Sequence, residues 1–211
     1  MIAHAIFFYF FSIVAVISAI MVTLVLSVVM FVSMLLNYEP NFIQEDSFVW
    51  FDMGHFSIRL GFLIDNLTII MLLVVALIST CTHIFSTQYL KGDIRYSRYF
   101  AYLGLFTFSM NGIVLSNSLI SMYIFWELVG VSSYLLIGHW FEKESAANAS
   151  KKAFLTNRVG DIGFFIGIMI LYSAVGSFAF SEVFDGVSNG LISGSALTLA
   201  GFGLFMGAMG K

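Results

Sequence analysis

The sequence predicts an all-α fold, a polytopic transmembrane helix bundle with about six spanning helices. Of the 211 residues, 60% are hydrophobic and only 10% are charged, whereas soluble domains carry roughly 25% charged residues. The mean hydropathy of +0.97 agrees with this composition. In addition, the apolar residues fall into segments long enough to cross a bilayer, which takes about 20 helical residues.

The first apolar segment, Ile2 to Leu36, contains no Gly, Pro, Asp, Glu, Lys or Arg. It is far longer than the apolar part of a signal peptide, so we expect one retained membrane helix. Because it exceeds the ~30 Å hydrocarbon core, the helix is expected to tilt or to extend beyond the membrane near His4. Five further segments are predicted to span the bilayer: Leu60–Gln88, Tyr96–Leu115, Leu119–Phe141, Lys152–Phe180 and Leu191 to Lys211.

The charges of the loops predict the orientation. The loops after the second and fourth predicted helices are basic, whereas those after the first and fifth are acidic and contain Arg59 as their only basic residue. Because Lys and Arg mark the cytoplasmic side, the N-terminus is expected inside and the short turn Ser116–Ser118 outside. The inner charges are Lys91, Arg95, Arg98, Lys143, Lys151 and Lys152; the outer ones are Glu39, Glu45, Asp46, Asp52, Glu182 and Asp185.

Glu127 lies well inside the apolar segment Leu119–Phe141. A charged group at bilayer depth costs roughly 2.5–3.5 kcal/mol on insertion scales. Desolvation disfavours the charged carboxylate, so a carboxyl group held there can bind and release a proton near neutral pH. Two interpretations stay open, a proton carrier and a neutral acid hydrogen-bonded to a neighbouring helix, and the first is favoured.

Four other charged residues are candidates for the same chemistry. Lys211 closes an apolar, Gly-rich segment; it is either a second proton carrier or the cytoplasmic end of a span, from which its side chain reaches the interface. Arg158 and Asp161 are three residues apart, so they share a helix face and are predicted to pair with each other. Asp65 is expected about one turn into the second span, where it caps the helix or lines a polar crevice.

Redox and nucleotide chemistry find no support in the sequence. There is no Walker A sequence and no C-x-x-C motif, and Cys81 is the only cysteine. No Cys/His cluster has metal-ligand spacing, so we expect neither a metal nor a cofactor in this chain. Without a basic tail, nucleic-acid binding is not expected either. The spacings Gly163-x-x-x-Gly167 and Gly203-x-x-x-Gly207 are interpreted as sites of close helix packing.

Several segments, in order, resemble the L-type (chain 5) antiporter-like membrane subunit of NADH:quinone oxidoreductase, the respiratory complex I. Phe125–Gly138 is similar to the glutamate-helix signature of that family, and Gly207–Lys211 matches the start of the block that holds its central lysine. The other matching segments are Phe62–Leu67, Arg98–Leu103 and Lys152–Asp161. The resemblance covers about residues 56 to 211.

The resemblance implies that Glu127 is the glutamate of a proton channel and that Lys211 is the lysine with which it pairs. It implies a fold of two inverted repeats with broken helices, of which this chain, as an N-terminal fragment, would hold most of the first. The chain would then be a non-redox subunit of a proton-translocating NADH:quinone oxidoreductase in the cell inner membrane or an equivalent energy-transducing membrane. Its partners would be protons, the lipid bilayer and other membrane subunits of complex I. NADH, FMN, iron–sulfur clusters and quinone would be bound by partner subunits.

Two regions are expected, residues 1–55 with the N-terminal helix and an acidic external loop, and residues 56–211 with the incomplete proton-translocating domain. The main alternative is a subunit of a multi-subunit sodium/proton antiporter, since that family shares the Trp-Glu helix and the Gly-Lys block. The residues Glu127–Tyr134 and Asn157–Asp161 favour the complex I branch. A membrane scaffold without an ion path is a third hypothesis, and it predicts that Glu127 is replaceable by Gln.

Overall fold

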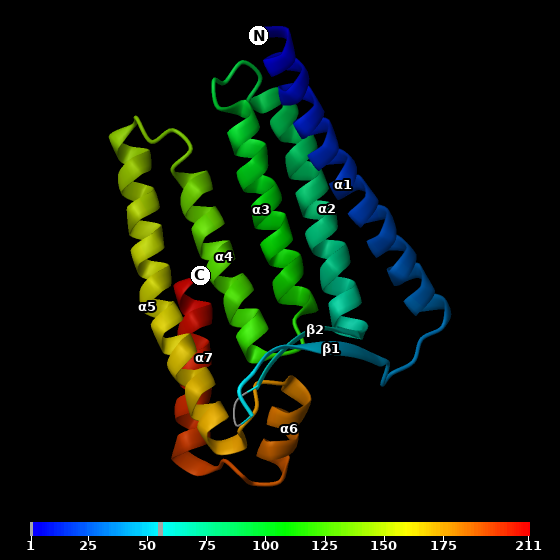
Figure 1. Ribbon diagram of the computed structural model, residues 1–211, viewed down its shortest axis with the longest axis vertical. Coiled ribbons are helices and arrows are strands. Elements are labelled where there is room, and N and C mark those ends of the chain that lie inside the picture. The colour runs from blue at the N-terminus through cyan, green and yellow to red at the C-terminus, as the bar shows by residue number, and fades with distance from the viewer. Residues whose placement is uncertain (1, 55–56) are drawn as a thin grey trace.

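Helices dominate the computed structural model, which describes residues 2–54 and 57–211, with side chains from Ile13 onward in these ranges. The long helices stand side by side, and a β-hairpin and a short helix cover their lower end (Figure 1). The predicted helical membrane bundle is therefore confirmed. The elements are α1 (Ile2–Leu36), β1 (Ile43–Asp52), β2 (Ser57–Asp65), α2 (Asn66–Tyr89), α3 (Tyr96–Leu115), α4 (Leu119–Ile137), α5 (Glu144–Val175), α6 (Phe180–Ser188) and α7 (Gly194–Gly210).

Four of the described helices are long and apolar enough to cross a membrane: Ile13–Leu36 of α1, α2, α4 and α5. Helix α3 has 20 residues and packs against α2 and α4, with Thr107 and Ser109 buried. Such polar residues lower its hydropathy, although their hydroxyls are satisfied by carbonyl groups one turn earlier. Helix α7 is the shorter apolar helix, with 17 residues that pack along α5.

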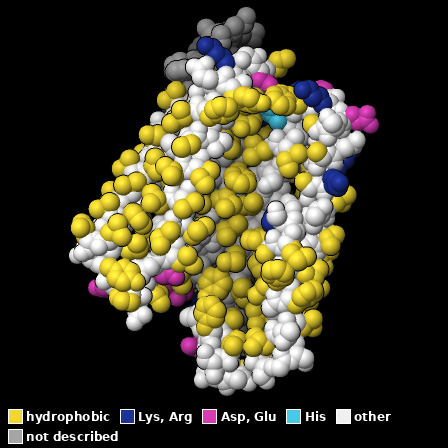
Figure 2. Space-filling model, turned by 180° about the vertical axis from the view of Figure 1, so that it is seen from behind, with side chains coloured by type: hydrophobic (Ala, Val, Ile, Leu, Met, Phe, Trp, Pro, Cys, Tyr) yellow, Lys and Arg dark blue, Asp and Glu magenta, His cyan; other side chains and the backbone are white. Residues whose placement is uncertain are grey.

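The surface and the loops fit a molecule that stands upright in a bilayer. The α2–α3 and α4–α5 loops, which carry the basic residues, lie at one end, and the hairpin, the α3–α4 turn and α6 lie at the other (Figure 1). The basic and acidic loops therefore lie at opposite ends, as expected, and the assignment of the basic end to the cytoplasmic side stays a prediction. Hydrophobic side chains cover most of the face drawn in Figure 2, and Lys and Arg are seen mainly toward its upper end.

The β-hairpin replaces two predicted features, the acidic external loop and the start of the second span. Strands β1 and β2 pair antiparallel from Ile43↔Asp65 to Asp52↔Ser57, and α2 begins at Asn66 instead of Leu60. The apolar residues of β2 directly precede those of α2, so hydropathy alone merges the strand with the helix. The expected boundary between residues 55 and 56 lies outside the described residues.

The inner ends of α4 and α5 also differ from the prediction. Helix α4 ends at Ile137, short of Phe141, and α5 begins at Glu144, before the predicted Lys152. The first turns of α5 are polar, and they therefore give no hydropathy signal although they are helical. They extend α5 beyond the apolar segment and toward the loop on the inner side.

The outer end of α5 is fixed by a glycine. Helix α5 ends at Val175 instead of Phe180, because Gly176 adopts a left-handed conformation (φ 80°) that favours glycine. The predicted acidic loop then forms helix α6, which buries Val183. This residue joins a hydrophobic core with the second half of α5 and the start of α7; the buried members are Leu119, Phe164, Ile168, Leu171, Phe178, Val183, Ile192 and Ala200.

Helices α5 and α7 approach each other closely through glycines, as their small-residue spacings predicted. A Cβ atom at Gly203 would lie 2.7 Å from the Gly163 carbonyl oxygen, and one at Gly167 would lie 2.7 Å from the Ala200 carbonyl oxygen. Gly160 and Gly210 meet at the other end of the interface, where a Cβ on either would lie 2.9 Å from the Cα of the other. This packing brings the end of α7 beside the middle of α5.

Gly203→Val is therefore expected to destabilise the protein by about 1–3 kcal/mol, because the new methyl groups meet backbone atoms that cannot rotate away. The full-length subunit should show a lower apparent Tm in detergent. Gly201→Val is the matched control on the same helix, since a Cβ at Gly201 meets no atom within 4 Å. Equal Tm values for the two variants would contradict the packing described above.

Candidate functional site

Two ion pairs lie next to each other where α4, α5 and the end of α7 meet. In the first, the Arg158 guanidinium on α5 contacts the Glu127 carboxylate on α4. The Glu127 side chain is 19% exposed, and the Arg158 guanidinium carbon lies 4.7 Å from the centre of the Phe154 ring. Glu127 is therefore held by a cation on the neighbouring helix. This pairing offsets the cost of keeping a charged carboxylate at this depth.

The second ion pair joins Asp161 on α5 to Lys211 at the end of α7. The Lys211 Nζ atom lies 3.8 Å from Asp161 Oδ2, and the Trp126 indole donates a hydrogen bond of 3.0 Å to Asp161 Oδ1. The Asp161 side chain is only 3% exposed. Both of its oxygens thus have a partner, as a buried carboxylate requires.

Lys211 reaches this position along a glycine of α4. A Cβ at Gly130 would lie 2.5 Å from Lys211 Nζ, so a side chain at this position would collide with the ammonium group. Gly130 follows Glu127 by three residues and therefore shares its helix face. The end of α7 lies midway along α4 and α5, away from the basic loops (Figure 1), and the Lys211 side chain is 15% exposed.

The predicted pairs are therefore exchanged. The sequence predicted Glu127 with Lys211 and Arg158 with Asp161, whereas the ion pairs are Glu127–Arg158 and Asp161–Lys211. Arg158 and Asp161 do share a face of α5, as predicted, but each reaches to a different neighbouring helix. All four groups still belong to one cluster, since Arg158 and Asp161 are one turn apart.

Asp65 does not belong to this cluster. It is the N-cap of α2, and its Oδ1 accepts a 2.7 Å hydrogen bond from the Thr68 amide. The prediction of a cap is confirmed, but its place one turn inside the helix is wrong because α2 begins at Asn66. The N-cap bond satisfies one of the amides that a helix start leaves free.

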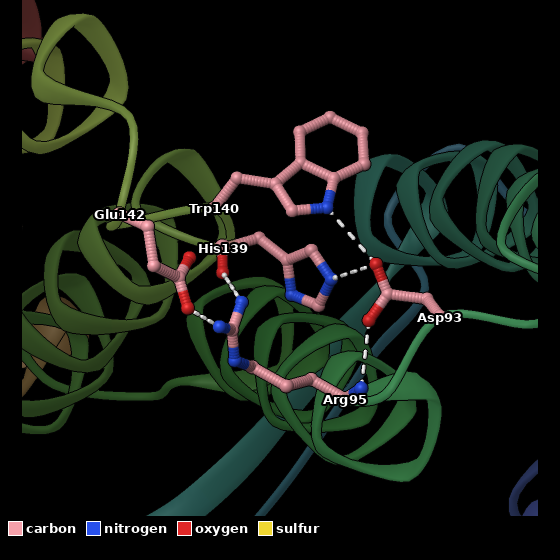
Figure 3. Close-up of polar contacts among 5 residues, drawn as sticks. All are labelled: Asp93, Arg95, His139, Trp140 and Glu142. Atoms are coloured by element: carbon pink, nitrogen blue, oxygen red, sulfur yellow. Dashed lines mark hydrogen bonds and ion pairs between the residues drawn. The ribbon is translucent and has the colours of Figure 1, made fainter.

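A separate polar cluster joins the two inner loops (Figure 3). Asp93 accepts hydrogen bonds from the Arg95 amide (2.7 Å) and the Trp140 indole (2.9 Å), and His139 Nε2 lies 3.4 Å from the same carboxylate. Arg95 also contacts Glu142 and donates to the His139 carbonyl oxygen (3.2 Å). The Arg95 amide and the Trp140 indole, with His139, lower the pKa of Asp93 below its ordinary value of 3.8.

Asp93→Asn is expected to lower the apparent Tm by about 2–4 °C, because the charged form makes the stronger hydrogen bonds. A carboxyl group with a depressed pKa stabilises the fold above its ordinary pKa, and this contribution is lost as the pH falls through the folded-state pKa. The Tm difference should therefore persist from pH 8 to pH 5. Asp185→Asn, at an exposed position of α6, is the control; a difference that disappears already at pH 5 would contradict the depressed pKa.

Trp126, Gly130 and Asp93 take part in these clusters but were not among the predicted residues. Trp126 directly precedes Glu127, and an indole needs a hydrogen-bond acceptor when it is half-buried. The spacing of Gly130 from Glu127 was a second available signal, since it leaves room on the face that carries the carboxylate. Among the described residues, no group of three His, Cys, Asp or Glu is placed to hold a metal ion.

The fold and the buried ion pairs define a multi-pass membrane protein with ionisable groups inside the helix bundle. Residues 116–211 match the family model described as "NADH:quinone oxidoreductase/Mrp antiporter, TM", and residues 50–100 match "NADH-Ubiquinone oxidoreductase (complex I), chain 5 N-terminus". Together the two models match most of the chain. The chain belongs to the family of antiporter-like membrane subunits of NADH:quinone oxidoreductase.

Individual proteins agree with this assignment. The chain is 45% identical over 193 residues to "NAD(P)H-quinone oxidoreductase subunit 5, chloroplastic" of Draba nemorosa, covering 88% of this chain and 26% of the relative. It thus spans about a quarter of the length of that relative. The fold resembles a chain of the archaeal membrane-bound sulfane sulfur reductase (TM-score 0.75, 16% identity, 94% of this chain and 41% of that one). It also resembles a chain of the Mrp complex of a Dietzia species (TM-score 0.71, 17% identity, 96% of this chain and 23% of that one).

Proposed function

We propose that this chain is part of a proton-translocating, non-redox membrane subunit of an NAD(P)H:quinone oxidoreductase. The observation that carries the proposal is the cluster of two carboxylates and two cations inside the bundle. The names of its relatives support the same function. NADH, FMN, iron–sulfur clusters and quinone would be bound by partner subunits, and other membrane subunits would adjoin this one.

The ion pairs suggest how protons are moved. A carboxylate that loses its cation away from water is stabilised by taking up a proton, and the return of the cation favours its release. In the proposed step, Arg158 moves away from Glu127, and Glu127 binds a proton. Lys211 lies along the same face of α4, beside Gly130, so its movement from Asp161 toward Glu127 would expel that proton.

The site residues have distinct proposed roles. Glu127 and Lys211 carry protons. Arg158 and Asp161 are their ion-pair partners and hold these two residues in the paired state. Asp65 has a structural role as a helix cap, which places it outside the proposed proton path. The proposed location is an energy-transducing membrane; it is not restricted to the cell inner membrane because the relatives are chloroplast proteins by name.

Proton translocation by the complete complex tests the proposal. Proteoliposomes that oxidise NADH in sodium-free buffer should acidify or alkalinise their interior, as read from a pH-sensitive dye. The double variant Asp161→Asn/Lys211→Ala removes both charges of one pair and should lower the protons moved per electron pair at least ~10-fold. Unchanged proton movement in this variant would overturn the proposal.

A sodium/proton antiporter subunit is the second candidate, because the chain resembles a chain of the Mrp complex in fold and one family model names both classes. It predicts sodium-dependent proton exchange without NADH oxidation. The same proteoliposomes separate the two functions when sodium is added in the absence of NADH. Exchange under that condition alone would favour the antiporter.

A further inference from the structure

A basic cavity opens at the inner ends of α3, α4 and α5. Its volume is about 410 Å³, and Arg98 from the first turn of α3 and Lys151 from α5 both line it. The lining contains no Asp or Glu. The other lining residues are Tyr102, Tyr134, Leu135, Gly138, Phe141, Ala147 and Ser150.

The two cations of this cavity lack acidic partners. Neither Arg98 nor Lys151 forms an ion pair within the part of the chain that the structure describes, and Arg98 Nε is buried without a hydrogen-bond acceptor. Arg95, close by, does have such a partner in Glu142. Because neither Arg98 nor Lys151 is paired with a carboxylate of the described residues, the cavity carries an unbalanced positive charge that an anion would neutralise.

Aromatic rings fix the position of Arg98. Its guanidinium carbon lies 5.4 Å from the centre of the Phe141 ring and 6.0 Å from that of Tyr102. These cation–π contacts orient the guanidinium without neutralising it. A guanidinium held in this way can bind two oxygens of a phosphate at once, and Lys151 supplies a second positive charge.

We propose that this cavity binds the phosphate group of an anionic phospholipid from the inner leaflet. Phosphate is the shared chemistry of a lipid headgroup and of free phosphate, but two features favour the lipid. The volume falls within the ~300–1,000 Å³ of small-molecule pockets, which leaves room for a glycerol group beside the phosphate. The wall also includes Leu135 and Phe141, and basic pockets between helices on the cytoplasmic side suit anionic lipids.

The hydroxyl groups of Tyr102 and Tyr134 add two further donors. Both residues line the cavity, and neither hydroxyl has a hydrogen-bond partner among the described residues. The Tyr134 ring also packs against the Phe154 ring in a tilted arrangement, with the ring centres 5.5 Å apart, and the Arg158 guanidinium lies over that same Phe154 ring. The rings of Tyr134 and Phe154 therefore connect the lipid site with the Glu127–Arg158 pair. The proposed lipid site does not depend on the proposed proton transfer.

Photolabelling of the complete complex in detergent tests the lipid site. The probe is a phosphatidylglycerol with a diazirine in its acyl chain, and labelled peptides are mapped by mass spectrometry. Peptides that contain Tyr134 or Phe141 should be labelled. Arg98→Gln and Lys151→Gln should each reduce this labelling about 10-fold, whereas Lys152→Gln, the neighbouring exposed lysine that does not line the cavity, should leave it unchanged.

Competition distinguishes the possible ligands. Excess unlabelled phosphatidylglycerol should suppress labelling, and excess phosphatidylcholine should do so at least 10-fold less effectively. Equal suppression by phosphatidylcholine would overturn the requirement for an anionic lipid. Suppression by inorganic phosphate at the concentration at which phosphatidylglycerol acts would assign the cavity to free phosphate and overturn the lipid. Lys151 is an exposed residue, so its variant keeps the test valid should Arg98→Gln fail to fold.

Discussion

Glu127→Gln in the complete complex is expected to lower the number of protons moved per electron pair at least ~10-fold. Glutamine keeps the size and hydrogen-bonding capacity of the side chain but cannot take up or release a proton. The change also leaves Arg158 without its carboxylate; because the Arg158 side chain is 37% exposed and lies over Phe154, the guanidinium retains other stabilising contacts. Assembly of the complex should therefore persist.

Glu144→Gln is the matched control for this variant, because it makes the same chemical change at an exposed position in the first turn of α5. It should leave proton movement at the wild-type value. Both variants are measured in proteoliposomes, with NADH oxidation recorded in parallel so that loss of electron transfer is distinguished from loss of coupling. Wild-type coupling in Glu127→Gln would support a membrane scaffold without an ion path.

The sequence was sufficient to predict the bundle, the separation of basic from acidic loops and close helix packing at the glycines of α5 and α7, because each depends on local patterns. Long apolar segments, the sign of the loop charges and the glycine spacings are all readable from the chain. The β-hairpin was missed for a physical reason. Its apolar strand β2 runs directly into α2, and only the cap formed by Asp65 marks the boundary.

The members of the charged cluster were predicted, but their pairing was not. Arg158 and Asp161 are one turn apart on α5, which made a local pair the simplest expectation. The actual partners depend on which helix lies on each side of α5, and this is a property of the tertiary packing. Glu127 on α4 takes Arg158, whereas the close contact of α5 with α7 places Lys211 beside Asp161.

Lys211→Ala should separate these two pairings through stability. With Lys211 removed, Asp161 keeps the Trp126 hydrogen bond but becomes an unpaired carboxylate that is 3% exposed. Breaking a buried pair by removing one partner costs about 3–5 kcal/mol, whereas removing both partners is far less costly. The single variant should lower the apparent Tm of the complex by roughly 5 °C.

Adding Asp161→Asn to Lys211→Ala should restore most of that loss, because the second change removes the unpaired charge. Adding Glu127→Gln to Lys211→Ala should restore none of it, since Glu127 keeps Arg158 as its partner. The opposite result, rescue by Glu127→Gln and not by Asp161→Asn, would mean that Lys211 pairs with Glu127 in the assembled complex. The pairs Glu127–Arg158 and Asp161–Lys211 would then not be the ones that stabilise the membrane subunit in the complex.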